Sequence, residues 1–260
     1  MIGQVANQQQ NGSSNLTSSL QNKAWQRLIR EKKALTEDSP LLDTNIKTAI
    51  IKEITYKEAS SIILEYEWLG TMARSKKHYG IFFEGFLAGA VCYSQCDGWT
   101  HRTVLKYGAD LAKTWVLSRG ACVHWAHTNS ASKLISFSLK LLNNTEKAEI
   151  VIAYSDYEAG ELGTVYQATN WVHLGIASNS YKGFISPSGE KFHRNIIYDI
   201  RRKEGTLKTK SWTQQVKELI DHGWTTYDIV GKRRYVYPFT TALRNIILVD
   251  AKLYPKRVAV

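Results

Sequence analysis

The chain has 260 residues with an ordinary globular content of hydrophobic side chains (43%), enough for one sizeable domain with extensions or for two small domains. It has no apolar run long enough to span a bilayer and no signal-peptide pattern, so we expect a cytoplasmic protein without a membrane partner. Its three cysteines, Cys92, Cys96 and Cys122, form no repeated framework, which argues against a disulfide-stabilised secreted domain.

The formal net charge of +11 is concentrated near the C-terminus. Residues 182–260 contain 16 Lys or Arg against 7 Asp or Glu, whereas residues 1–181 contain 18 against 16. Such an excess indicates a polyanionic partner, with nucleic acid as the first choice. A solvated, solubilising segment explains the same excess, and both interpretations stay open.

The N-terminal part predicts a tail followed by a helix. Residues 1–22 are rich in Gln, Asn, Ser and Gly without apolar periodicity, which predicts disorder. Residues 23–45 indicate a short helix, with its apolar residues on one side, and then a linker around Pro40.

From residue 46 the hydrophobic pattern alternates between strand and helix periods. Ile150–Tyr154 is a continuous apolar run, typical of a strand buried on both faces. A helix over Ser130–Leu142 would join it in parallel to a strand over Thr114–Arg119. Other expected elements are strands at Ala49–Thr55 and Trp171–Leu174, helices at Tyr56–Leu69 and Gly163–Thr169, and a hairpin of Ile81–Phe83 with Phe86–Tyr93.

This order predicts the α/β class, with a mixed sheet and flanking helices over residues 46–204. The order also resembles that of the Gcn5-related N-acyltransferases. Residues 205–260 then form a small basic C-terminal extension, with a helix over Trp212–Asp221 and strands at Tyr227–Val230 and Arg234–Tyr237. Basic and aromatic residues interleave over Gly231–Phe239 (GKRRYVYPF), as on a surface that contacts DNA, although an edge hairpin with a charged turn fits equally well.

Three segments carry a more specific resemblance. They are WVLSRGACVHWAHTNSASKLISFSLKLL from Trp115, AYSDYEAGELGTVYQATNWVHLG from Ala153, and SGEKFHRNIIYD from Ser188. Together they resemble the corresponding blocks of the phage Mom family. The resemblance implies a DNA-modifying transferase that converts adenine to an N6-carbamoylmethyl form and so protects phage DNA from restriction. It leaves the donor open: an acyl-coenzyme A or a related donor, with or without a metal ion such as iron.

Two residues are the predicted catalytic groups. Asp156 follows a buried strand, where open α/β sheets bind ligands, and adenine N6 is a weak nucleophile that needs a base to take its proton. Glu158 and Glu161 compete for this role, and Asp156 as a mere helix cap is the structural alternative. The resemblance to acyltransferases assigns Tyr166 to the donor side, as an acid or a hydrogen-bond anchor; packing in the core is its alternative.

A second set of residues is predicted to bind the donor. A helix that starts near residue 130 offers backbone N–H groups and a positive dipole end to an anion. Acyltransferases place a glycine-rich turn here, whereas this chain has NSASK, which puts ordinary coenzyme A binding in doubt. The predicted donor-binding residues, with simple capping as the alternative for the last four, are Ser118, Arg119, Asn129, Ser130, Ser132 and Lys133.

A third set is predicted to contact DNA. An enzyme that acts on a duplex base must flip it out, so aromatic residues such as Trp125, Trp171 and Tyr237 are stacking candidates, although each is more often a core residue. His78 would recognise the base or act as a second acid or base, with a surface turn as its alternative. The predicted DNA-binding residues are His78, Arg194, Lys232, Arg233, Arg234 and Tyr235.

Cys122, His124 and His127 have the spacing of a partial metal site, but no nearby Cys or His pair completes it, so no metal ligand is assigned. Three functions therefore remain open. The first is the adenine-modifying enzyme. The others are an N-acyltransferase that uses acyl-coenzyme A on a small amine or protein, and a non-catalytic DNA-binding accessory protein.

Overall fold

The computed structural model describes residues 24–96, 100, 104–157, 159–177, 181–192, 194, 196–205 and 210–256. The predicted disordered tail over residues 1–22 and the candidate Glu158 lie outside these residues. Contacts divide the chain into two compact units: a large unit of residues 1–175 and 233–260, and a small unit of residues 176–232.

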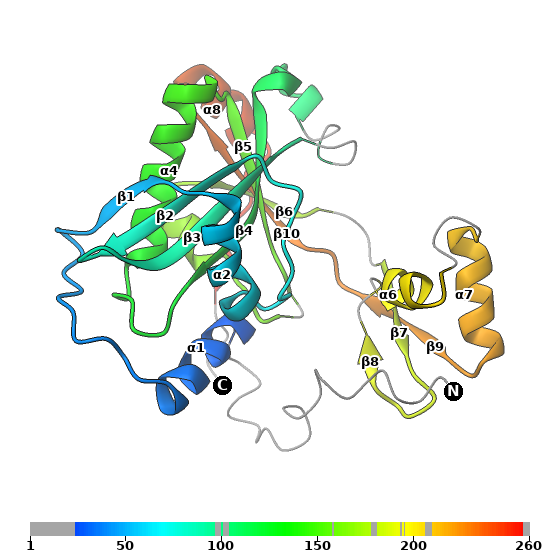
Figure 1. Ribbon diagram of the computed structural model, residues 1–260. Helices are drawn as coiled ribbons and strands as arrows, with labels where there is room; N and C mark the ends of the chain where they lie inside the picture. Colours follow the sequence, from blue (N-terminus) through cyan, green and yellow to red (C-terminus); the bar gives the residue numbers. More distant parts are fainter. Residues whose placement is uncertain are drawn as a thin grey trace. The chain divides into compact units, whose positions relative to one another are not determined.

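The large unit is built on a seven-stranded mixed sheet with the strand order β1-β2-β3-β4-β5-β10-β6 (Figure 1). The pairs β1–β2, β2–β3, β3–β4 and β5–β10 are antiparallel, whereas β4 and β5 are parallel. The strands of this sheet are β1 (Ile50–Glu53), β2 (Lys77–Phe83), β3 (Phe86–Gln95), β4 (Thr114–Cys122), β5 (Ile150–Ser155), β6 (Val172–Ile176) and β10 (Arg233–Pro238). The predicted α/β class with a mixed sheet is confirmed.

Helices cover both faces of this sheet; in Figure 1, α2 passes in front of the strands and α4 behind them. A capping box starts α2, because Thr55 accepts from the Glu58 N–H and the Glu58 side chain accepts from the Thr55 N–H. The predicted helix between the parallel strands is α4, whose apolar stripe is buried. The helices of the large unit whose bounds the structure describes are α1 (Trp25–Thr36), α2 (Tyr56–Tyr66), the 3-10 turn η2 (Leu111–Lys113), α4 (Ser130–Glu146), α5 (Thr164–Ala168) and α8 (Thr241–Leu248).

The hairpin of β2 and β3 turns at Glu84 and Gly85, as predicted. Both residues have positive φ angles, 47° and 88°, which match the right-handed twist of the flanking strands. Glycine takes this conformation without strain, so a two-residue loop is enough. The strands extend further than the sequence pattern indicated, from Lys77 to Gln95.

In its described residues, the small unit has a three-stranded antiparallel sheet and two helices. The sheet order is β8-β7-β9, and a small core forms around Phe184, Ile197 and Leu219. Its elements are β7 (Tyr181–Ile185), β8 (Lys191–Phe192), α6 (Ile196–Lys203), α7 (Trp212–Asp221) and β9 (Thr225–Ile229). A hydrogen bond of 2.7 Å from the Ala177 N–H to the Lys232 carbonyl joins the two ends of the unit.

The small unit is an insertion between β6 and β10, which are neighbours in the large sheet. This division differs from the predicted boundary at residue 205, and residues 205–260 do not form one extension. The hairpin interpretation of GKRRYVYPF is also wrong: β9 pairs with β7, whereas β10 pairs with β5. The reason is burial, since Tyr235 and Val236 lie in the interior of the large unit and fill the sheet beside β5.

Candidate active site

The strands β4 and β5 separate at their carboxyl ends. Their parallel pairing runs from Thr114 opposite Ile150 to Leu117 opposite Ala153, yet β4 continues to Cys122 along β3. A bulge on β4 at Ser118 accompanies the separation, because the register with β3 shifts there. Ligands of open α/β sheets bind outside the carboxyl ends of such strands. We therefore refer to the opening between these ends as the candidate site.

Asp156 lies at this opening, directly after β5, and is only 3% exposed. Its loop is closed on itself, because the Glu161 N–H donates to the Asp156 carbonyl at 3.0 Å. Arg233 fixes the loop from β10 by donating to the Glu161 carbonyl at 3.1 Å. The guanidinium of Arg233 also lies 4.7 Å from the centre of the half-exposed Tyr157 ring. The structure thus holds a buried carboxylate in a tethered loop at the end of a central strand.

Tyr166 of α5 lies beside this loop. Its ring packs against Tyr235 at 5.0 Å and against Trp171 at 5.1 Å between ring centres. Burial raises the pKa of the Tyr166 hydroxyl well above its ordinary value, with the Glu161 carboxylate adding to the effect. The phenol is therefore protonated at neutral pH, and it can donate a proton but cannot act as a base.

Tyr235 is not at the surface, where DNA would reach it. Its side chain is completely buried, and its hydroxyl donates to the Leu162 carbonyl at 2.6 Å. The ring also packs on His173 of β6, with 5.0 Å between the ring centres. Its predicted contact with DNA is therefore corrected: Tyr235 is a core residue, because β10 is an inner strand, paired between β5 and β6.

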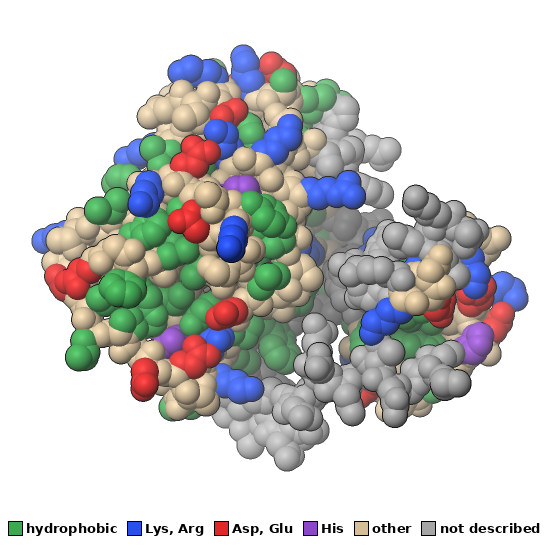
Figure 2. All heavy atoms as spheres, viewed as in Figure 1, with side chains coloured by type: hydrophobic (Ala, Val, Ile, Leu, Met, Phe, Trp, Pro, Cys, Tyr) green, Lys and Arg blue, Asp and Glu red, His purple; other side chains and the backbone are tan. Residues whose placement is uncertain are grey.

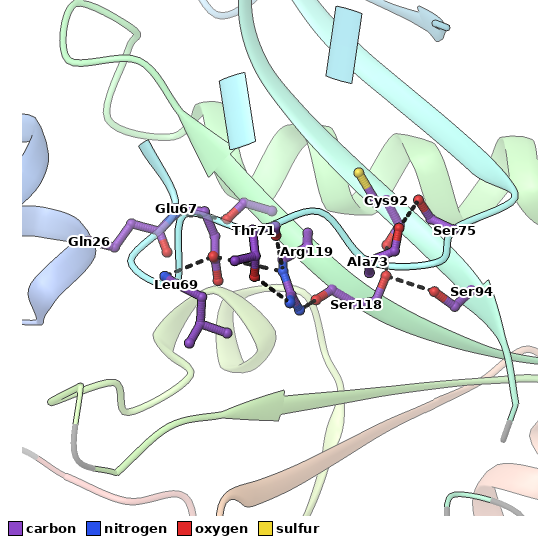
Figure 3. A network of polar contacts seen from close by, with 11 residues as sticks. Gln26, Glu67, Leu69, Thr71, Ala73, Ser75, Cys92, Ser94, Ser118 and Arg119 are labelled. Atoms are coloured by element: carbon purple, nitrogen blue, oxygen red, sulfur yellow. Dashed lines mark hydrogen bonds and ion pairs between the residues drawn. The ribbon is translucent and has the colours of Figure 1, made fainter. Parts of the chain in front are cut away.

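Arg119 clamps the segment after α2 onto β4 (Figure 3). Its guanidinium donates to the Thr71 carbonyl at 2.6 Å, to the Thr71 hydroxyl at 3.2 Å and to the Ser118 carbonyl at 2.6 Å. The carboxylate of Glu67 lies 3.9 Å away and accepts from the Leu69 N–H at 2.9 Å. These donors of Arg119, predicted to bind a group donor, are directed to the protein itself.

Ser118 belongs to the same network. Its hydroxyl donates to the Cys92 carbonyl at 3.0 Å and accepts from Ser94 at 3.0 Å (Figure 3). Cys92 is buried, which raises the pKa of its thiol to about 12 and leaves it an inert thiol. Beyond Cys92, the Ser75 hydroxyl lies 2.8 Å from Nε2 of His78. His78 is buried rather than part of a surface turn, and burial lowers the pKa of its imidazole.

The start of α4 does not present its predicted anion-binding side chains together. Ser132 donates to the Asn129 carbonyl at 3.0 Å, and the Lys133 ammonium donates to the carbonyl of Ile46. Asn129 makes no side-chain cap. The Ser130 hydroxyl is buried and has no hydrogen-bond partner among the residues that the structure describes. The arrangement does not fit a Ser and Lys clamp for a phosphate, because both polar groups are bonded to backbone carbonyls of the protein.

The predicted basic residues fall in both units. Arg194 and Lys232 belong to the small unit, where the Arg194 guanidinium lies 5.0 Å from the centre of the Trp212 ring. Arg233 and Arg234 begin β10 in the large unit. On the face of the large unit drawn in Figure 2, positive and negative side chains are interspersed with hydrophobic ones.

His124 and His127 have separate partners, and Cys122 is a buried thiol outside any disulfide. Nδ1 of His124 lies 2.9 Å from the Tyr66 hydroxyl, and Nδ1 of His127 accepts from the Asn129 N–H at 3.1 Å. Within the described part of the chain, no group of three or more His, Cys, Asp or Glu side chains is arranged to hold a metal ion. In the same residues, no helix is both long and apolar enough to cross a bilayer.

The sequence interpretation overlooked two residues of the polar network in Figure 3, Glu67 and Ser75. Glu67 is 8% exposed and lies beside Arg119, and its charge raises the pKa of Tyr166. A carboxylate directly between the aromatic residues Tyr66 and Trp68 was the available signal. Ser75, the neighbour of His78, had no such signal, since a Ser among basic residues is typical of a solvated turn.

The chain is similar in structure to several solved acetyltransferases. An N-acetyltransferase from Staphylococcus aureus Mu50 is 12% identical, with a TM-score of 0.40 over 74% of this chain and 99% of that one. A spermidine N-acetyltransferase from Vibrio cholerae, solved with CoA and spermine, is 9% identical, with a TM-score of 0.40 over 76% and 99%. No curated protein matches the sequence with significance. A model of the Mom protein family matches residues 48–256.

Proposed function

Because the chain belongs to the Mom protein family, we propose that it is a DNA-modifying transferase that places a carbamoylmethyl group on N6 of adenine. In a phage, this modification would mask DNA from restriction enzymes. The position of Asp156 is the observation that supports the proposal most, since it is a buried carboxylate at the carboxyl end of a central strand.

The proposed chemistry needs a base because the N6 lone pair is delocalised into the adenine ring. As the bond from N6 to the transferred carbon forms, the Asp156 carboxylate takes the N6 proton. The leaving group departs from that carbon with the bonding electron pair. Tyr166, whose raised pKa keeps its phenol protonated, donates a proton or a hydrogen bond to this leaving group. The donor of the carbamoylmethyl group is a small molecule.

DNA is the proposed polyanionic partner. The excess of Lys and Arg over residues 182–260 supports binding through phosphates, which gives affinity without sequence preference. The proposed contacts lie within this segment. They are Arg194 and Lys232 of the small unit and Arg233 and Arg234 of β10. Tyr235 is excluded from this set because it is buried.

Mass spectrometry of nucleosides tests the proposal directly. DNA from cells that express the protein should contain a deoxyadenosine that is heavier by a carbamoylmethyl group. Asp156→Asn, which keeps the size of the side chain and removes the base, should abolish this species. Asp221→Asn is the matched control, because Asp221 is an exposed acid on α7, and it should leave the yield unchanged.

Two negative outcomes point to different functions. Unmodified DNA together with turnover of acetyl-coenzyme A on a small amine, without any need for DNA, would establish an N-acyltransferase instead. Unmodified DNA together with salt-sensitive DNA binding would establish a non-catalytic accessory protein. Expression in a second host excludes a missing donor as the cause of a negative result.

A further inference from the structure

The first turn of α1 bridges the two sides of the candidate site. The Gln26 side chain donates to the Gly120 carbonyl at 2.8 Å, and the Trp25 N–H donates to the Ala159 carbonyl at 2.9 Å. Gly120 lies on β4 beyond its last pairing with β5, and Ala159 lies in the loop that follows Asp156. The helix precedes residues 48–256, which the model of the Mom family matches. A segment outside the part shared with the family therefore contributes to the site.

Polar contacts also fix the rest of α1, although none of its residues is buried. Arg30 donates to the Ala126 carbonyl at 3.2 Å. At the end of the helix, Lys33 pairs with Glu37 at 2.6 Å, and the Tyr66 hydroxyl donates to Glu37 at 3.4 Å. Because contacts at both ends set its position, the first turn is held at the opening between β4 and β5.

Trp25 is the conspicuous residue of this turn. The residue is 43% exposed, and its indole stacks on no other ring among the described residues. A Trp side chain is mostly buried when its role is structural, whereas a half-exposed one at a site offers a flat face to a planar ligand. Leu28 and Ile29 of the same helix are half-buried, whereas Trp25 is exposed, so the indole contributes less to the attachment of α1 than these two residues do.

We propose that Trp25 is a stacking residue for the acceptor base, and this inference rests on the proposed function. A base that is flipped out of the duplex loses its stacking neighbours, and an aromatic face in the site replaces them. Stacking recognises any planar base and does not distinguish one base from another. The loop that begins at Asp156 therefore supplies the selectivity for adenine. Gln26 and the Ala159 carbonyl are the positioning groups, because they hold the backbone of Trp25 between β4 and the loop after Asp156.

Photo-cross-linking with DNA that carries a single 8-azidoadenine tests the proposal on the full chain. We expect the peptide that contains Trp25 to be cross-linked in the wild type, and we expect Trp25→Ala to lose the cross-link. Steady-state modification should show KM for DNA raised about 10-fold or more in Trp25→Ala, with a smaller change in kcat. Trp25→Phe keeps an aromatic face and should restore most of the affinity.

Leu35→Ala is the matched control, since Leu35 is 88% exposed on the same helix, and it should behave as the wild type. An unchanged KM in Trp25→Ala, or cross-links confined to other peptides, would overturn the stacking role while DNA modification persists. Cross-linking at Trp25 in a protein that leaves deoxyadenosine unmodified would overturn the proposed function and keep the stacking role. Circular dichroism confirms that each variant is folded.

Discussion

The ring of Tyr235 lies directly on the backbone of Gly163. A Cβ atom added to Gly163 would be 2.5 Å from Cε2 of this ring, well inside any real contact distance. The ring cannot move aside, because its hydroxyl donates a hydrogen bond to the Leu162 carbonyl at 2.6 Å and the ring packs against Tyr166. Gly163 also has a φ angle of 66°, which disfavours other residues. This close approach sets the start of α5 and hence the position of Tyr166.

We expect Gly163→Ala to lower the free energy of unfolding by about 2 to 4 kcal/mol, from backbone strain and overpacking together. Gly85→Ala is the control: its φ angle is 88°, but a Cβ there meets no atom within 4 Å. It should cost only about 1 kcal/mol. Urea denaturation compares the two variants, and equal losses would contradict a role for the Tyr235 contact.

Arg119 should act on stability through the segment that it clamps. We expect Arg119→Ala to lower the free energy of unfolding by about 2 to 3 kcal/mol, because it removes charge-assisted hydrogen bonds to Thr71 and leaves Glu67 buried without this cation. Ser94→Ala, which removes one bond to Ser118, should cost about 1 kcal/mol. If Arg119→Ala is fully stable and loses only donor binding, the donor-binding role predicted from the sequence is the correct one.

His78 should make the protein less stable in mild acid. Burial lowers the pKa of its imidazole in the folded state, while the unfolded chain titrates near 6.5. The unfolded state therefore binds the proton more readily, so stability is lost as the pH falls through about 6.5 toward the folded pKa.

The melting temperature between pH 7 and pH 5 measures this effect. His78→Gln should flatten the decline, because it removes the group that binds a proton on unfolding. His222→Gln is the control, since His222 is exposed at the end of α7, and it should leave the decline unchanged. A decline that is equal in the wild type and His78→Gln would assign the acid sensitivity to other groups.

Removal of the small unit should leave a folded large unit. Residues 177–232 leave from β6 and return at β10, which are adjacent strands, so a short Gly-Ser linker can replace them. We expect cooperative unfolding to persist, whereas affinity for DNA falls and depends less on salt, because phosphate contacts are lost. Calorimetry and fluorescence anisotropy across a salt series give the two readouts. Unchanged affinity and salt dependence would place the DNA contacts entirely on the large unit.

Local patterns predicted the elements whose burial follows from their own sequence. The apolar run of β5 and the apolar stripe of α4 are visible in the sequence. The prediction of Asp156 depends on β5, because Asp156 is the first residue after this strand. The family resemblance added the roles of Asp156 and Tyr166, which spacing alone does not supply. Several elements were missed because their sequences carry a weak local signal. They are β7, β8, α6 and α8.

The larger error concerned β10, and its cause is non-local. Alternating basic and aromatic residues have the same pattern at a DNA-binding surface and in a central strand whose buried positions are aromatic. Only the pairing of Tyr235 with Ala153, across more than eighty residues, decides between the two. The clamp of Arg119 on Thr71 was hidden for the same reason, since nothing near either residue in the sequence indicates the other.

The insertion between β6 and β10 has a consequence for how the chain matures. Among the described strands, β10 is synthesised after all the others of the large sheet, yet it lies between β5 and β6. After β6 has been translated, residues 177–232 must still be translated before β10, which takes about 3 to 11 seconds at ordinary rates. During this time the unpaired edge of β5, one of the most apolar strands, is open to pairing with another nascent chain. Slower translation of the small unit should therefore increase aggregation of the nascent chain, even though the folded protein is unchanged.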